Sequence, residues 1–228
     1  MYNLDCAAYE SILLGLFSIW RGQFPERPKP NEVCVGYSRD GWSWSRPDRR
    51  GFCPISETKG DWNYGNVQSA GGCCLVVGDQ LYFYCSGRGN EWVTSLAVLR
   101  RDGFVSMAAG DMPGTLTTRP VTFKGKYLFV NVDAPTGELR VEILDEKGEI
   151  LTPFSAANCT PVRNDKTRQA VSWKGSADLG EVAGKTVRFR FHLTNGKLYA
   201  FWVSPDASGK SHGFVAAGGP GFTGITDS

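Results

Sequence analysis

Two acidic side chains near the start of the chain have the chemistry of an acid–base pair. Glu10 precedes the apolar segment 12–20, so we expect it to begin an inner β-strand, where hydrophobic surroundings favour the protonated form of a general acid. Asp5 lies upstream on the same approach. Hydrolysis of a glycosidic bond uses two carboxyls about 5.5 Å or about 6.5–9.5 Å apart. Glu10 and Asp5 are therefore catalytic candidates, although Glu10 could simply bond nearby backbone and Asp5 could cap a loop.

A second group of side chains suits the recognition of a sugar. Aromatic rings stack on the C–H-rich surfaces of sugars, while amides, carboxylates and guanidinium groups bond to hydroxyls. The sequence predicts a substrate wall here, and the alternative is an aromatic plug between strand units. The residues are Asp61, Trp62, Asn63, Tyr64, Asn66 and Gln68, with Arg88 after a later strand.

Other site chemistries have little support in the sequence. His192 and His212 are the only histidines and have no acidic neighbour in sequence, so a metal pair is not predicted. Ser11 lacks the Gly-x-Ser-x-Gly turn of a serine hydrolase. The seven cysteines show no CxxC spacing, so we expect small buried hydrophobes and no zinc site or disulfide framework. No cofactor is predicted.

The elements that must position these residues are short β-strands in repeated units. SRDGW at 38–42 recurs as RRDGF at 100–104, each copy after an apolar strand, and Asp-Gly between two strands favours a hairpin. A period near 60 residues with about four strands per unit is typical of a β-propeller blade. We predict a partial β-propeller of about two blades over residues 1–110. Two blades cannot close a ring, so an upstream propeller segment or a second chain would have to complete it.

Residues 111–228 show a different pattern and are predicted to form a β-sandwich with a Gly-rich tail from residue 216. Alternating strands are expected at 127–132, 138–144, 186–193 and 197–203, with one or two more inside the irregular segment 152–174. Asn195-Gly196 predicts a type I′ hairpin. The aromatic residues Trp173, Tyr199 and Trp202 are expected in the core, with a sugar platform as the alternative.

Three motifs carry a family resemblance: YSRDGWSW at 37–44, GDWN at 60–63 and LYFYCSG at 81–87. They resemble the clan of glycoside hydrolase families 32 and 43, which implies a five-bladed propeller and, in family 32, a C-terminal β-sandwich. The resemblance implies a general acid Glu at a position comparable to Glu10, but without the Glu-Cys dipeptide of family 32. The early-blade Asn-Asp-Pro-Asn-Gly and Arg-Asp-Pro motifs do not occur here, which implies an incomplete catalytic set.

The predicted fold class is therefore all-β, and two functions remain open. One is a glycoside hydrolase-like protein that acts on or binds a glycan, and the other is a non-catalytic carbohydrate-binding or interaction module. A sialidase-like enzyme is disfavoured because its Ser-x-Asp-x-Gly-x-Thr-Trp box is missing. The net charge of +2 and the absence of a basic run argue against nucleic acid as a partner. No apolar stretch is long enough to span a bilayer, and no secretory signal is recognised.

Overall fold

A computed structural model describes residues 1–27, 29–69 and 71–228 of the chain. These described residues are all-β and contain no helix, and none of their sheets closes on itself. The chain divides into two compact units, one formed by residues 1–101 with 212–228 and the other by residues 102–211. The tail, expected to follow the second domain as coil, thus belongs to the first unit. Among the described residues there is no helix of the length and hydropathy that crossing a bilayer would need.

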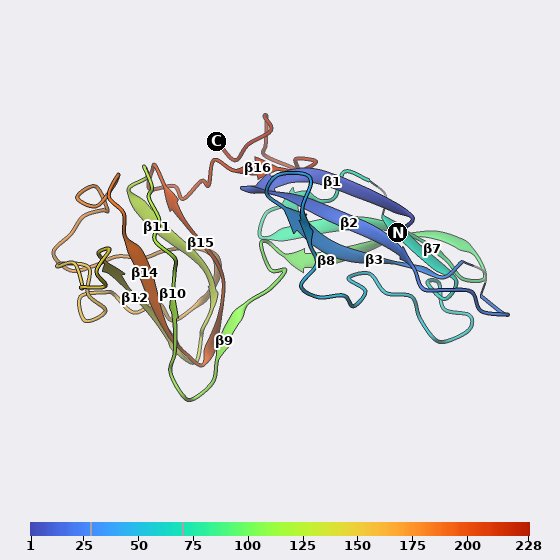
Figure 1. Cartoon of the computed structure of the whole chain (residues 1–228), viewed down its shortest axis with the longest axis horizontal. Helices are drawn as coiled ribbons and strands as arrows, with labels where there is room; N and C mark the ends of the chain where they lie inside the picture. The colour runs from blue at the N-terminus through green and yellow to red at the C-terminus, as the bar shows by residue number, and fades with distance from the viewer. Residues whose placement is uncertain (28, 70) are drawn as a thin grey trace. The chain divides into compact units, whose positions relative to one another are not determined.

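The first sheet of unit 1 is antiparallel, with the strand order β16-β1-β2-β3-β4. Neighbouring strands β1, β2 and β3 lie side by side in Figure 1. Inward-facing side chains of β2 and β3, such as Leu16 and Val33, are fully buried. The strands are β1 (Asn3–Glu10), β2 (Ile12–Trp20), β3 (Asn31–Ser38), β4 (Trp44–Ser45) and β16 (Phe214–Val215).

The turn between β3 and β4 explains the first SRDGW motif. The Asp40 carboxylate accepts hydrogen bonds from the backbone amides of Ser43 at 2.7 Å and Trp42 at 2.8 Å. These two amides, with the Ser38 hydroxyl, lower the pKa of Asp40 to about 2. Asp40 therefore shapes a turn, because its carboxylate replaces backbone acceptors there.

The second sheet of unit 1 is built around β7. Strand β8 pairs with β7 along its whole length, while β5 and β6 share the opposite edge of β7. The bounds are β5 (Asn66–Ser69), β6 (Leu75–Val77), β7 (Gln80–Arg88) and β8 (Trp92–Arg100). The second Asp-Gly motif was expected to join two paired strands, and this is wrong: after the turn at Asp102 the chain enters β9, which pairs with β15 in the other unit. A local turn signal does not determine the partner of the strand that follows.

Unit 2 contains two antiparallel sheets, with the orders β10-β14-β12 and β13-β11-β15-β9. Both contribute to one core, which includes Val130 of β11, Val141 of β12 and Phe191 of β14. Strand β13 is the strand expected within 152–174. The bounds are β9 (Met107–Ala109), β10 (Gly114–Thr117), β11 (Tyr127–Asp133), β12 (Glu138–Leu144), β13 (Asp165–Ala170), β14 (Arg188–Thr194) and β15 (Gly196–Ser204).

The predicted hairpin at Asn195-Gly196 is wrong. Strands β14 and β15 follow each other in sequence, but β14 pairs with β10 and β12 whereas β15 pairs with β11 and β9. Asn195 has a φ of 44°, so the dipeptide does form a sharp turn. Gly196 lies against Ala134, where a Cβ would approach the Ala134 side chain to 2.7 Å. The turn is therefore a corner between two sheets, since β14 and β15 hydrogen-bond in different sheets and pack into one shared core.

Candidate functional site

Glu10 lies at the end of β1 and not at the start of an inner strand. Its backbone φ is 49°, and Glu10 with Ser11 forms the two-residue turn that joins β1 to β2. Glu10 therefore contributes its side chain from a hairpin turn, where positive φ is accommodated. The apolar segment 12–20, which Glu10 was expected to begin, forms the following strand, β2.

The structure does not bring Glu10 and Asp5 together. Asp5 lies within the paired part of β1, whereas Glu10 lies in the turn that ends this strand. Five residues of extended chain span roughly 16 Å. Asp5 instead accepts hydrogen bonds from Asn3 Nδ2 at 3.2 Å and from the hydroxyl of Ser69. These two carboxyls lack the spacing for glycoside hydrolysis.

A different carboxylate approaches Glu10. The Arg101 guanidinium nitrogen Nη2 lies 2.9 Å from Asp227 Oδ2 and 3.5 Å from Glu10 Oε1. The side chains of Arg101 and Asp227 are 10% and 7% exposed. We call these three residues the Arg101 cluster. It ties the C-terminal segment to the β1–β2 turn, because the strand β16 that precedes Asp227 also pairs with β1.

Four of the predicted sugar-binding residues bond to or pack against other parts of unit 1. Asn63 Nδ2 donates to the Pro54 carbonyl at 2.8 Å, and Asp61 Oδ2 accepts from the Ser56 hydroxyl at 2.5 Å. The Asn66 amide donates to the carbonyl of Lys29 at 2.8 Å.

Tyr64 is the fourth of these residues. Its ring centroid lies 4.9 Å from the guanidinium carbon of Arg27, which also stacks on Phe24 at 5.0 Å. Arg27 in turn donates to the Ser56 carbonyl at 3.0 Å and to the Glu57 carboxylate at 2.8 Å. Tyr64 and its neighbours therefore support the loop, which favours the structural alternative for this part of the predicted wall.

Trp62 packs on the end of β7. Its ring covers Gly87 so closely that a Cβ at this position would collide with it. Gly87 belongs to the buried side of β7, together with Phe83 and Cys85. Trp62 remains 40% exposed on its outer side. Trp62 therefore covers the buried side of β7 at this end, and part of its ring remains exposed to solvent.

Arg88 and Gln68 lie on the opposite, open face of the same sheet. Arg88 stands opposite Trp92 in the β7–β8 ladder, and its guanidinium carbon lies 3.9 Å from the Trp92 ring centroid. Gln68 stands opposite Ser86, which stands opposite Thr94. Because alternate residues share a face, these side chains form two rows across the sheet.

The next row on this face is Tyr84 with Leu96. Tyr84 is 45% exposed and Trp92 is 77% exposed. We define the Trp92 face as the open surface formed by Gln68, Tyr84, Ser86, Arg88, Trp92 and Thr94. Sequence reasoning missed Tyr84, Ser86, Trp92 and Thr94. The two-residue alternation of β7, in which Leu81, Phe83 and Cys85 point inward, would have placed Tyr84 and Ser86 outward.

Unit 2 carries a second polar cluster, around the buried Glu142. Glu142 Oε1 lies 2.9 Å from Arg190 Nη1 and 3.1 Å from His192 Nε2. His192 has no acidic neighbour in sequence, but it meets Glu142 in space because β12 and β14 pair with each other. Burial raises the pKa of Glu142, but the hydrogen bond and charge of His192, the Ala156 amide and Arg190 outweigh it, so the pKa is lowered.

The lowered pKa of Glu142 makes unit 2 sensitive to acid. A carboxyl with a lowered folded-state pKa stabilises the fold above its ordinary pKa of 4.5, and this contribution is lost as the pH falls through the folded-state value. We expect Glu142→Gln to lower the Tm at pH 7 by roughly 4–8 °C. The difference from wild type should shrink as the pH falls below 4.5. Thermal unfolding followed from pH 7 to pH 3, with exposed Glu181→Gln as control, checks this; an equal Tm loss at every pH would contradict it.

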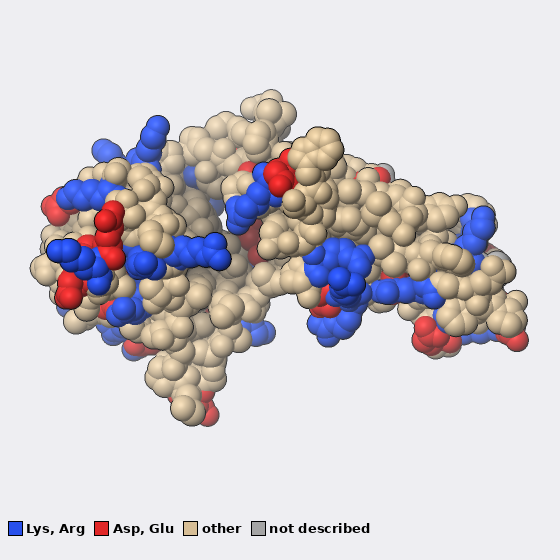
Figure 2. All heavy atoms as spheres, in the orientation of Figure 1, with Lys and Arg blue, Asp and Glu red and all other residues tan. Residues whose placement is uncertain are grey.

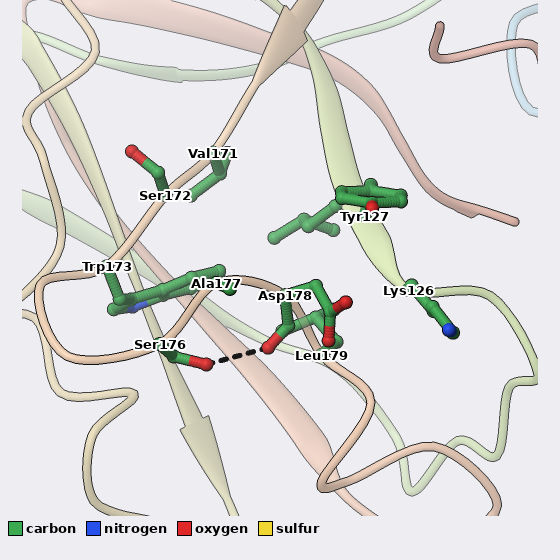
Figure 3. A pocket seen from close by; sticks show the side chains of 10 residues that line it. Lys126, Tyr127, Val171, Ser172, Trp173, Ser176, Ala177, Asp178 and Leu179 are labelled. Carbon is green, nitrogen blue, oxygen red and sulfur yellow. Dashed lines mark hydrogen bonds between the residues drawn. The ribbon is translucent and has the colours of Figure 1, made fainter. Parts of the chain in front are cut away.

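A small cavity in unit 2 is too narrow for a sugar. It measures about 20 Å³ and is lined in part by Tyr127, Trp173 and Leu179. Figure 3 shows these side chains around it, with the Ser176 hydroxyl bonded to the Asp178 carbonyl at 2.7 Å. A volume of this size holds about one water molecule, whereas ligand pockets measure about 300–1,000 Å³.

Charges on the molecular surface are mixed. On the face shown in Figure 2, basic and acidic side chains are interspersed, and much of the surface is neither. In the part of the chain that the structure describes, no group of three or more His, Cys, Asp or Glu side chains could hold a metal ion.

Comparisons with known proteins give one distant structural match. No protein-family model matches the chain. No curated protein matches it either. Among solved structures, it is similar to a glycoside hydrolase family 43 arabinoxylan arabinofuranohydrolase from Bacillus subtilis in complex with cellotetraose, with 10% identity and a TM-score of 0.27. The match covers 89% of this chain and 53% of that chain, so this chain spans about half its length. Similarity at this level defines neither the fold family nor the activity.

Proposed function

We propose that this chain is a non-catalytic glycan-binding module that binds a neutral polysaccharide on the Trp92 face. In this proposal the two sheets of unit 1 are two propeller-type blades, and the two sheets of unit 2 form a β-sandwich. Consecutive antiparallel strands within each sheet of unit 1 and the shared core of unit 2 support these assignments.

The observation that carries the proposal is the chemistry of the Trp92 face. It combines exposed aromatic rings, Trp92 and Tyr84, with the hydroxyls of Ser86 and Thr94 and the amide of Gln68. Rows of side chains on neighbouring strands are about 4.8 Å apart. A flat surface of this kind suits the apolar face and the hydroxyl edge of an extended sugar chain.

The positions of the carboxylates support binding without hydrolysis. Asp5 lies within β1 and Glu10 in the turn at its end, and Glu10 and Asp227 share the guanidinium of Arg101. A hydrolase needs one carboxyl free to donate a proton and another free to attack or to activate water. Arg101 occupies the space between Glu10 and Asp227, so we assign the three residues a structural role.

The experiment that tests this function is a binding titration. The full chain is titrated calorimetrically with laminarin, xylan, galactomannan and dextran, with polygalacturonate as an acidic comparison. For the glycan that binds best, we expect Trp92→Ala to weaken affinity by about tenfold or more, since aromatic anchors dominate such contacts. The control is Trp42→Ala, because Trp42 is 91% exposed but belongs to the turn between β3 and β4. An equal loss in both variants, or no binding to any of the glycans, would overturn the proposal.

Hydrolysis is measured in parallel with aryl glycosides. We expect no turnover by the wild-type chain. Turnover that Glu10→Gln abolishes, with the fold retained, would instead support the glycoside hydrolase hypothesis.

A second candidate function is an interaction module, and the edge of β8 favours it. Among the described strands β8 pairs with β7 alone, and Leu96 and Val98 are 41% and 50% exposed. An open strand edge can accept a further strand from another chain. We then expect the wild-type chain to self-associate in sedimentation experiments, and the double substitution Leu96→Lys with Val98→Lys to abolish this self-association. If the wild-type chain is already a monomer and the substitutions change nothing, the candidate fails.

A further inference from the structure

Two buried thiols of unit 1 are in direct contact. The Sγ atoms of Cys53 and Cys85 lie 3.3 Å apart, and the two residues are separated by 32 positions in the chain. Cys53 is 8% exposed and Cys85 is 2% exposed. All seven cysteines are free thiols in this structure.

Cys53 lies outside the named strands and bridges to β3 of the first sheet, whereas Cys85 belongs to β7 of the second sheet. Cys53 forms two backbone hydrogen bonds with Val33 of β3, at 3.0 and 3.1 Å. Cys85 lies within β7, paired with Ser69 of β5 and Ser95 of β8. The ring of Phe52, next to Cys53, packs edge-on against Phe83 of β7 with centroids 5.0 Å apart. The contact between the sulfurs is therefore a consequence of core packing, and each sulfur faces the other across the junction of two sheets.

The contact also shifts the pKa values of the two thiols in opposite directions. The hydrogen bond between the two sulfurs lowers the pKa of Cys85, because it stabilises the thiolate. The same contact, together with burial, raises the pKa of Cys53. The contact thus favours the thiolate form of Cys85, and the thiolate is the reactive form of a thiol.

We propose that Cys53 and Cys85 are a modification site, at which a peroxide oxidises the two thiols to a disulfide that joins the two sheets of unit 1. The Cys85 thiolate attacks one peroxide oxygen, the O–O bond breaks, and hydroxide leaves to give a sulfenic acid. Cys53 Sγ then attacks Cys85 Sγ, the S–O bond breaks, and water leaves. In total two thiols and one hydrogen peroxide give one disulfide and two waters, with the sulfurs oxidised and the peroxide reduced.

Little movement separates the reduced pair from the disulfide. A disulfide bond length is about 2.05 Å, so the sulfurs must approach by somewhat more than 1 Å. The bond would close a loop of some 30 residues and constrain the unfolded chain, which stabilises the folded unit. The disulfide would therefore link the segment bonded to β3 covalently to β7.

The test is disulfide mapping of the full-length protein after treatment with hydrogen peroxide. Free thiols are blocked with N-ethylmaleimide under denaturing conditions, and the chain is cleaved with trypsin and chymotrypsin. Cleavage after Tyr84 separates Cys85 from Cys73 and Cys74, so each partner is assigned without ambiguity. We expect a Cys53–Cys85 peptide pair and a rise in Tm of roughly 5–15 °C that dithiothreitol reverses.

The matched variants separate this site from general thiol oxidation. Cys53→Ser should lose both the linked peptide and the Tm rise, whereas Cys6→Ser, which removes an exposed thiol, should retain both. The proposal is overturned if wild-type Cys53 and Cys85 are both recovered with maleimide after oxidation, or if either is linked mainly to another cysteine. The disulfide map of the wild-type protein is sufficient to decide the proposal, so the test does not depend on whether a variant folds.

Discussion

Replacing Arg101 with methionine is expected to lower the free energy of unfolding of unit 1 by about 3–5 kcal/mol. The substitution keeps most of the side-chain volume but removes the cation that Asp227 and Glu10 share. Asp227 is 5% exposed, so its carboxylate would remain buried without this counter-charge. Urea unfolding, followed by circular dichroism at pH 7, measures the loss.

The same substitution should release the C-terminal segment. Asp227 contacts Arg101, and β16 adds only Phe214 and Val215 to the edge of β1. We expect limited proteolysis to cut within 216–228 faster in Arg101→Met than in wild type. Arg50→Met is the control, because the ion pair of Arg50 with Asp48 is on the surface and should leave both measurements unchanged. Equal effects of both substitutions would contradict a structural role for the Arg101 cluster.

The second large effect is expected at Trp173 in unit 2. Trp173 is 6% exposed, its ring packs edge-on against Phe154 with centroids 5.5 Å apart, and Nε1 donates to the Val141 carbonyl at 2.8 Å. Trp173→Ala removes this packing and leaves the Val141 carbonyl without the indole donor, so unit 2 should lose about 3–5 kcal/mol of unfolding free energy. Thermal and urea unfolding provide the measurement.

Trp173→Ala also separates the two interpretations of the aromatic residues in unit 2. A core residue affects stability, whereas a sugar platform affects affinity at unchanged stability. Ile150→Ala serves as control because Ile150 is 49% exposed, and it should cost less than about 1 kcal/mol. If Trp173→Ala unfolds no more easily than this control but loses glycan affinity, the assignment to the core is wrong.

The glycan-binding proposal depends on which face of a strand is open. The sequence indicated a sugar-binding wall at Asp61, Asn63 and Tyr64 because of their residue types. In the structure Asp61 and Asn63 bond within their own loop and Tyr64 packs against Arg27, while exposed aromatic and hydroxyl groups gather on the Trp92 face. Residue type identified suitable chemistry nearby but did not distinguish side chains that support a loop from side chains that meet solvent.

The sequence by itself determined the all-β class and the position of most strands, such as those around 127–132 and 138–144. These features depend on local alternation and turn residues, which a short window contains. It also predicted the hairpin at SRDGW, residues 38–42, since an Asp-Gly turn is completed within four or five residues.

Only the tertiary structure decided which segments meet. It separated Glu10 from Asp5, joined Glu10 to Arg101 and Asp227, and turned Asn195-Gly196 into a corner between sheets. It also placed Cys53 against Cys85. The separation of Glu10 from Asp5 reflects the extended backbone of β1, whereas the other outcomes depend on how hydrophobic faces far apart in the chain are buried against one another. The residue types of a site can be read from short stretches of sequence. The distances between their side chains are set by packing between segments that are far apart in the chain.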